Sequence, residues 1–247
     1  RMQAELLAER LEPEGVRVAW GMRYGSPSIA DAATELMKAG CDRILSMPLY
    51  PQYSATTTAT ANDQLFRFLL KTRLQPAIRT LPPFADDPVY IEALAETLNA
   101  ALTGLGETPQ MVVTSFHGLP NDYVEKGDPY RAECVRTVEA LRRRLSLNEE
   151  RMPMTFQSRF GPAKWLEPYT APFIAGLPAK GIRRVAVMTP GFMTDCLETL
   201  DELGNEVKEE FLAAGGEELT LVPCLNASAP SINLLTYLAR KQMQGWI

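Results

Sequence analysis

Short apolar runs rich in β-branched residues alternate with helix-like spacings of apolar positions along almost the whole chain. The apolar runs predict strands near residues 17–24, 43–51, 77–82, 111–118, 152–158, 183–192 and 219–225. The spacings between them predict helices near residues 28–39, 55–71, 87–103, 129–146, 167–177, 196–214 and 229–241. Because strands that alternate with helices are typical of βαβ crossovers, we expect an α/β fold with parallel sheets.

A polar break at GETPQ, residues 106–110, separates two halves of similar make-up. We therefore expect two lobes, residues 1–108 and residues 109–247. The chain starts at Arg1, directly in a helical pattern without a preceding strand. We expect that the N-terminal part of the natural protein, with the first βα unit of the first lobe, is absent from this sequence.

The composition is that of an ordinary globular protein, with 46% hydrophobic residues and a formal charge of −5 over 247 residues. This acidic balance argues against a general nucleic-acid binder. No apolar run approaches the roughly 20 residues that span a bilayer, and no signal peptide is present. The four cysteines are scattered without a C-x-x-C pair, so we expect a reducing, cytoplasmic location.

The chain contains a single histidine, His117, which excludes zinc sites built from two or three histidines. No glycine-rich nucleotide motif opens a helix after a strand, so a nucleotide cofactor is not expected. Ligands of parallel α/β sheets bind beyond the carboxyl ends of the strands. The polar residues predicted there are Arg23, Tyr24, Tyr50, Tyr53, His117, Gln157, Ser158, Asp195 and Glu198.

His117 follows a predicted strand and precedes Gly118 and Pro120, where the backbone turns sharply. A histidine in a turn can be purely structural, but this position at a strand end favours a site. An imidazole there can take up or release a proton near neutral pH, and it can bind a metal.

Three carboxylates follow the predicted strand at 183–192. Glu198 and Glu202 are four residues apart on one helix face, and Asp195 lies about one turn earlier. Asp195-x-x-Glu198 also has the form of a helix capping box, and Glu202 can be a solvated surface residue. A carboxylate stripe that faces an imidazole would instead bind a divalent cation. Trp165 follows Gly-Pro and is either a core aromatic or an exposed stacking surface.

Five segments, in this order, resemble those of ferrochelatases: GMRYG, LYPQYSATTT, SFHGLPNDYVEKGDPY, FQSRFGPAKWLEP and GFMTDCLETLDEL. The resemblance extends from about residue 20 to the C-terminus. It implies two Rossmann-like lobes with a porphyrin cleft between them. It also implies a lyase that inserts Fe2+ into protoporphyrin IX, with release of two protons, in the terminal step of haem biosynthesis.

The resemblance assigns roles residue by residue. It implies that His117 and Glu198 are catalytic and bind the metal, and that Asp195 and Glu202 lie on a path for metal or protons. The positions that match the porphyrin pocket are Arg23, Tyr24, Tyr50, Gln157, Ser158, Trp165 and Phe192.

The sequence departs from the family at two positions. Many members carry a histidine where this chain has Cys196, which could bind metal only as a thiolate. Animal-type members carry a cluster-binding cysteine where this chain has Ala55, and a cysteine-rich tail is absent here. We therefore expect no Fe–S cluster and no required cofactor, with Fe2+ as a substrate. We also expect a monomer that binds protoporphyrin IX, does not bind nucleic acid, and makes peripheral contact with the inner membrane.

Two other functions compete with this one. A related chelatase would insert Co2+ or Ni2+ into a more carboxylated tetrapyrrole, but such enzymes commonly use two histidines. A porphyrin or haem carrier would use His117 as an axial ligand and Glu198 only as a helix cap. A purely structural interpretation requires every motif to be coincidental.

Overall fold

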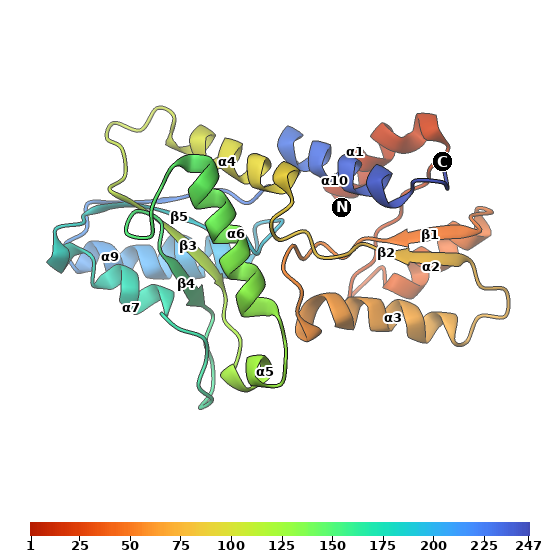
Figure 1. Ribbon diagram of the computed structural model, residues 1–247, viewed down its shortest axis with the longest axis horizontal. Coiled ribbons are helices and arrows are strands. Elements are labelled where there is room, and N and C mark those ends of the chain that lie inside the picture. Colours follow the sequence, from red (N-terminus) through yellow and green to blue (C-terminus); the bar gives the residue numbers. More distant parts are fainter. The chain divides into compact units, whose positions relative to one another are not determined.

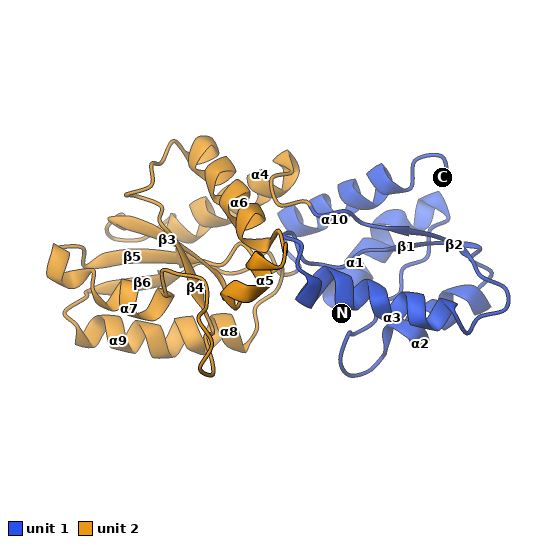
Figure 2. Cartoon of the chain, turned by 60° about the horizontal axis from the view of Figure 1, so that its bottom comes forward, with its two compact units in different colours: residues 1–83, 227–247 blue, residues 84–226 orange.

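The computed structural model describes all residues, 1–247, and they form two compact units that are described separately (Figure 1, Figure 2). Residues 1–83 and 227–247 form the first unit, and residues 84–226 form the second. This division differs from the boundary expected after residue 108. The helix before that boundary packs within the second unit, and the last helix of the chain returns to the first.

The first unit is a small parallel α/β layer structure. Its elements are α1 (Met2–Leu11), η1 (Glu12–Glu14), α2 (Ile29–Lys38), β1 (Arg43–Ser46), η2 (Ala55–Ala59), α3 (Thr60–Leu69), β2 (Ala77–Thr80) and α10 (Ala229–Gln242). β1 and β2 form a two-stranded parallel sheet. α1 packs against α10, and Ala33, Leu65 and Leu69 are buried where α2 meets α3. Ile78 of β2 packs against these three buried residues, so α2 and α3 cover one face of the sheet.

The strand predicted at residues 17–24 does not form, and this prediction is wrong. Only an isolated bridge joins Met22 to Ser28, and the Met22 N–H donates to the Pro27 carbonyl at 2.8 Å. β1 and β2 pair only with each other, so the segment has no neighbouring strand. An alternating pattern becomes a strand only where another backbone satisfies its N–H and C=O groups.

The second unit contains a four-stranded sheet in the order β4-β3-β5-β6, with every neighbouring pair parallel. Its elements are α4 (Pro88–Leu102), β3 (Met111–His117), α5 (Asn121–Glu125), α6 (Tyr130–Leu145), β4 (Met154–Gln157), α7 (Thr170–Ala175), η3 (Pro178–Lys180), β5 (Arg184–Met188), α8 (Leu197–Leu200), η4 (Glu202–Val207), α9 (Lys208–Ala213) and β6 (Glu218–Leu221). The predicted parallel α/β fold is confirmed.

Helices cover both faces of this sheet. α4 and α6 pack together, and α7 and α9 pack together (Figure 1). The buried cluster beneath α7 and α9 includes Val113 of β3, Val187 of β5, Ile174 of α7 and Phe211 of α9. These apolar contacts hold the inner strands β3 and β5, and therefore fix where their carboxyl ends lie.

The single helix predicted over residues 196–214 is interrupted. α8 is followed by the π-helical segment η4 and then by α9. Asp201 lies at the junction with φ −91° and ψ −60°. Asp195 precedes α8, whose N-cap is Cys196, so Asp195 does not share a helical stripe with Glu198. The wider turn of a π-helix often occurs at functional sites.

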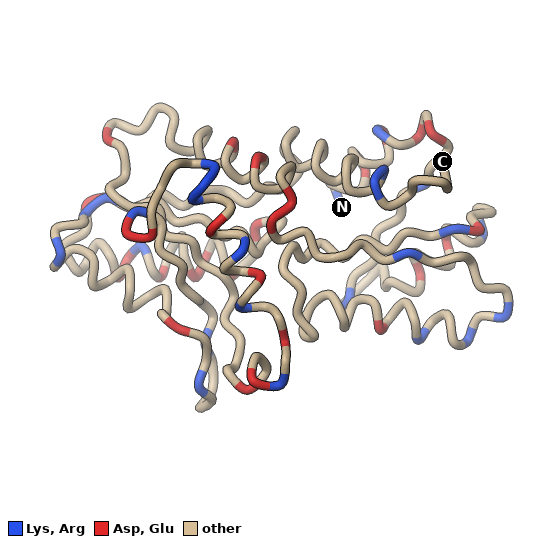
Figure 3. Tube along the Cα trace, viewed as in Figure 1, with Lys and Arg blue, Asp and Glu red and all other residues tan.

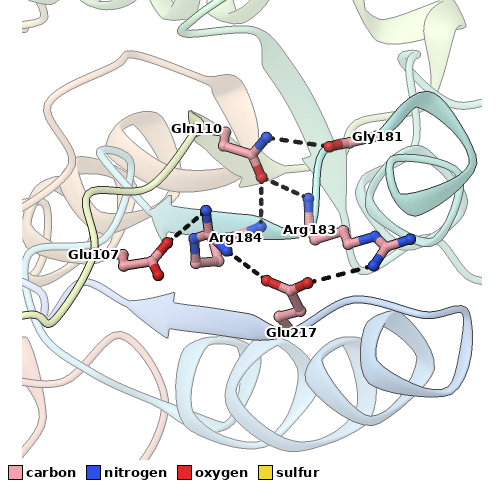
Figure 4. A network of polar contacts seen from close by, with 6 residues as sticks. All are labelled: Glu107, Gln110, Gly181, Arg183, Arg184 and Glu217. Carbon is pink, nitrogen blue, oxygen red and sulfur yellow. Dashed lines mark hydrogen bonds and ion pairs between the residues drawn. The ribbon is translucent and has the colours of Figure 1, made fainter.

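A polar network joins the starts of three strands (Figure 4). The Arg184 guanidinium contacts Glu107 at 2.6 Å and Glu217 at 2.5 Å. The Gln110 side-chain oxygen accepts from the backbone N–H groups of Arg183 and Arg184 at 2.8 and 3.1 Å. The network fixes the amino ends of β3, β5 and β6, at the edge opposite the carboxyl ends that ligands use.

Candidate active site

His117 is the last residue of β3, an inner strand, and it pairs in register with Gln157 of β4. Its Nδ1 lies 2.7 Å from the Gly118 carbonyl oxygen. A carbonyl oxygen can only accept a hydrogen bond, so Nδ1 carries the proton and Nε2 keeps a lone pair. The Tyr130 hydroxyl donates to the His117 carbonyl at 2.9 Å, which fixes the backbone. The half-buried ring therefore offers one nitrogen that can accept a proton or bind a metal.

Trp165 packs beside His117, with ring centroids 6.5 Å apart, and is only 5% exposed. The interpretation of Trp165 as an exposed stacking surface is therefore wrong, and the core alternative holds. Gly118 makes this packing possible, since a Cβ there would lie 2.9 Å from Trp165 Cε3. The exposed ring is Phe160, which is 74% exposed with its centroid 5.1 Å from that of Trp165. Sequence reasoning missed Phe160, although it stands directly before Gly161 at the same turn.

Gln157 and Ser158 connect the end of β4 to the interrupted helix. The Gln157 amide donates to the Glu198 carbonyl at 2.5 Å and to the Glu202 carboxylate at 3.3 Å. The Ser158 N–H and hydroxyl donate to the same carboxylate at 2.7 and 2.5 Å. Ser158 has φ +60°, a left-handed conformation that aims both donors at Glu202. The Glu202 carboxylate is therefore fixed by hydrogen bonds from Gln157 and Ser158 and is not merely a solvated surface group.

Glu198 lies in the first turn of α8 and is half-buried. A hydrogen bond from the Cys196 thiol, a bond from its own backbone N–H and an electrostatic interaction with His117 lower the pKa of the Glu198 carboxyl. Burial, followed by the interaction with Glu198, raises the pKa of the Cys196 thiol to about 11. At neutral pH and without a metal, Cys196 is therefore a thiol that donates to Glu198.

Asp195 fixes the loop before α8. Its carboxylate accepts from Asn226 Nδ2 at 2.6 Å, from the Cys224 N–H at 3.2 Å and from the Thr199 hydroxyl at 3.2 Å. Burial raises the pKa of Asp195, but these hydrogen bonds outweigh it and leave the pKa lowered. The predicted capping box of Asp195 with Glu198 is not observed, because Thr199 takes that position and bonds to the Cys196 N–H. The contacts of Asp195 are those of a structural residue.

An open pocket of about 410 Å³ lies beside this group. Its lining residues are Ser158, Arg159, Phe160, Leu197, Glu198, Asp201, Glu202 and Glu206. Glu206 extends the acidic row, and sequence reasoning missed it although it stands four residues after Glu202. No group of three or more His, Cys, Asp or Glu side chains lies in an arrangement that could hold a metal ion.

The candidate residues of the first unit form a separate group. The Arg23 guanidinium lies 4.3 Å above the Tyr24 ring, and Tyr24 is 75% exposed. Burial and the charge of Tyr24 raise the pKa of Tyr50, while Arg23 opposes this effect, so all three side chains interact. Arg23 Nε is buried without a hydrogen-bond partner, so this group retains an unused donor.

Phe192 lies in the loop after β5 and is half-buried. Its N–H donates to the Thr189 carbonyl at 3.0 Å, and no ring contact joins it to another candidate residue. The structure therefore groups His117, Trp165, Gln157, Ser158, Glu198 and Glu202 in the second unit, and Arg23, Tyr24 and Tyr50 in the first.

Known structures share this fold. SirB from Bacillus subtilis with Fe3+ has a TM-score of 0.66 at 13% identity, covering 97% of this chain and 88% of that one. DR2241 from Deinococcus radiodurans, described as structurally similar to chelatases, has a TM-score of 0.59 at 13% identity. It matches 96% of this chain over 50% of its own length. The fold, with a histidine and carboxylates at one sheet edge, defines a chelatase-like α/β protein.

Sequence comparison identifies the family. The family model described as Ferrochelatase matches residues 1–243. A ferrochelatase of Gluconobacter oxydans is 62% identical over 246 residues, which are 100% of this chain and 72% of that protein. A ferrochelatase of Mesorhizobium japonicum is 51% identical over 248 residues, which are 100% of this chain and 70% of that protein. The chain belongs to the ferrochelatase family, lyases that insert Fe2+ into protoporphyrin in the final step of haem biosynthesis.

Family membership confirms the expected class, a porphyrin metal chelatase. It argues against the two other functions considered, a porphyrin or haem carrier and a chelatase for a more carboxylated tetrapyrrole. None of its helices combines the length and apolar character needed to cross a bilayer.

Proposed function

We propose that His117 and Glu198 carry the insertion of Fe2+ into protoporphyrin IX, with His117 as proton acceptor and Glu198 as the metal-side carboxylate. The observation that supports this assignment most directly is the tautomer of His117. Its Nδ1–H is occupied by the Gly118 carbonyl, which leaves the Nε2 lone pair available. An electrostatic interaction with His117 also lowers the pKa of Glu198, so the base and the carboxylate share one site.

Metal insertion replaces two pyrrole N–H protons of the porphyrin by one Fe2+, so two protons must leave. A neutral imidazole accepts the first through Nε2 and becomes a cation that a nearby carboxylate stabilises. The acidic row of Glu198, Glu202 and Glu206 borders an open pocket, so it offers acceptors that lead towards solvent. Each proton can then pass outward before the second transfer takes place.

The same acidic row suits the arrival of the metal. Carboxylates attract a hydrated divalent cation, and a site with only one carboxylate and one imidazole holds it weakly. Weak binding is an advantage here, because the ion must be released to the four pyrrole nitrogens. We assign Asp195 to the structural support of this row, since its carboxylate is occupied by three donors.

We assign the porphyrin contacts to two kinds of residue. Arg23, with its unpaired Nε, can pair with a propionate, while Tyr24 and Tyr50 offer ring surface beside it. Gln157 and Trp165 are buried, at 3% and 5% exposure, and would act by holding the site residues in place. Ser158 would act in the same way through Glu202, and Phe192 stays assigned to the porphyrin pocket by the family resemblance.

We further propose a cytoplasmic monomer without a resident cofactor, which contacts the inner membrane peripherally. Its four cysteines are all free, and Cys134 and Cys224 are buried. The iron content and visible absorbance of the purified protein test for a cluster, and sedimentation equilibrium tests for the monomer.

The assay follows the loss of free-base porphyrin absorbance on addition of Fe2+ without oxygen, or of Zn2+ as a substitute. His117→Ala should lose at least about a hundredfold in kcat, and added imidazole should restore part of it. Glu198→Gln should lose at least about tenfold, whereas Glu209→Gln, an exposed matched control on α9, should retain wild-type rates.

Restoration by imidazole separates proton transfer from a structural loss, because a misfolded site would not recover. Full activity of His117→Ala would refute the assigned base. Tight porphyrin binding by the wild-type protein without metal insertion would refute the assigned chemistry for this chain.

A further inference from the structure

Three large apolar side chains at the end of α3 are exposed although the helix already buries another face. Phe66, Leu70 and Leu74 are 45%, 84% and 83% exposed. The core-facing positions of the helix include Leu65 and Leu69, which are 2% and 9% exposed. None of the three belongs to the buried cluster between α2 and α3, and large exposed apolar side chains in one place commonly mark an interaction surface.

The same segment carries unpaired positive charge. Arg67, Lys71 and Arg73 are exposed and form no ion pair. No acidic residue occurs between Asp63 and Asp86, although the chain as a whole has a formal charge of −5 (Figure 3). Basic and apolar side chains thus alternate from Phe66 to Leu74, across the last turn of α3 and the residues that follow it, without a compensating carboxylate in the segment.

The backbone of this segment has a defined conformation. The Thr72 hydroxyl donates to the Phe68 carbonyl at 3.0 Å, and the Gln75 amide donates to the Leu69 carbonyl at 2.7 Å. The Lys71 N–H also donates to the Phe68 carbonyl, at 3.1 Å. These bonds satisfy carbonyls at the helix end, so the exposed side chains project from a formed turn.

We propose that Phe66, Arg67, Leu70, Lys71, Arg73 and Leu74, the α3 patch, dock on a bilayer that contains anionic phospholipid. Apolar tips enter the boundary between head groups and acyl chains, while long basic side chains reach the phosphates. Each signal is weak alone, and stable reversible binding needs both. A partner protein would instead be expected to match an apolar patch with a polar rim, whereas here the two kinds interleave.

The proposal locates the peripheral membrane contact and does not depend on the metal-insertion chemistry.

The test is co-sedimentation of the purified chain with phosphatidylcholine vesicles, with and without one-third phosphatidylglycerol, at low salt. The wild-type protein should bind only the anionic vesicles and dissociate at high salt. Lys71→Gln with Arg73→Gln should weaken binding by about 25-fold, roughly fivefold per charge.

Two further variants make the test specific. Leu70→Ser with Leu74→Ser should weaken binding by at least about tenfold, and both positions are exposed enough for the fold to persist. Lys180→Gln with Lys208→Gln removes two exposed, unpaired charges from the other unit and should bind as wild type. Zinc insertion in vesicle-free solution should be unchanged in all three, which separates this proposal from the assigned chemistry.

Failure of the wild-type protein to bind anionic vesicles would overturn the proposal. Equal loss of binding in the Lys180 and Lys208 control would also overturn it, because only the net charge would then matter. A wild-type dimer that the leucine variants convert to a monomer would assign the α3 patch to a second copy of the chain instead.

Discussion

Gly118→Ala tests whether the close approach of β3 and β4 sets the position of His117. Gly118 donates its N–H to the Gln157 carbonyl at 2.7 Å. An added Cβ would lie 2.8 Å from that carbonyl oxygen and 2.9 Å from Trp165 Cε3. Neither neighbour is the free end of a flexible chain, because one is backbone and the other is a buried ring. Both contacts must therefore lengthen by about 0.5 Å to reach ordinary contact.

The cost follows from this geometry. Overpacking of this kind destabilises a protein by about 1–3 kcal/mol. For a chain of this size, that corresponds to a fall in Tm of roughly 3–10 °C. The displacement occurs one residue from His117, and misplacing a catalytic group by about 1 Å can cost a hundredfold, so we expect kcat to fall about tenfold.

Thermal unfolding and Zn2+ insertion measure the two effects on the same preparation. Gly106→Ala is the matched control, since nothing lies within 4 Å of the position that its added methyl group would take, and its φ is not positive. Wild-type Tm and kcat in Gly118→Ala would show that the edge of the sheet absorbs the methyl group, and the reasoning about His117 would be refuted.

Three other substitutions test single contacts. Ser158→Ala loses the hydroxyl bond to Glu202 and should lower the free energy of urea unfolding by about 1–2 kcal/mol. Ser158→Gly loses the same bond, but glycine adopts φ +60° without strain, so its free energy of unfolding should be about 1 kcal/mol higher than that of Ser158→Ala. The lowered pKa of Asp195 means that its carboxylate stabilises the fold above its unfolded-state pKa. The Tm advantage of wild type over Asp195→Asn should therefore be full above about pH 4 and be lost as the pH falls further, through the lowered pKa of Asp195. Trp165→Phe removes a buried N–H that has no partner, so unfolding should show a cost below about 1.5 kcal/mol.

The alternation of strands and helices was predictable because it depends on local periodicity. A strand buried in a parallel sheet is apolar over a short run, and its covering helix repeats apolar positions every three or four residues. Five of the six observed strands lie within the predicted ranges, β6 begins one residue before its range, and most helices lie within theirs. The exception at residues 17–24 has a strand-like pattern without a pairing partner.

The site was only partly predictable. His117 and Gln157 could be placed at one sheet edge because parallel strands end on the same side. The spacing of Glu198 and Glu202 suggested a helical stripe, but a spacing cannot show that the helix widens into a π-turn between them. The acidic row survives because Gln157 and Ser158 hold its carboxylate from the neighbouring strand.

The sequence by itself determined the parallel α/β class, the strand ends that carry His117 and Gln157, and the motifs of the ferrochelatase family. These properties follow from neighbours in the chain and from residue identity. Tertiary structure alone decided that Trp165 is buried, that Asp195 supports a loop and that the last helix returns to the first unit. Each of these depends on groups far apart in sequence, and no local pattern encodes which distant surface or donor a side chain will meet.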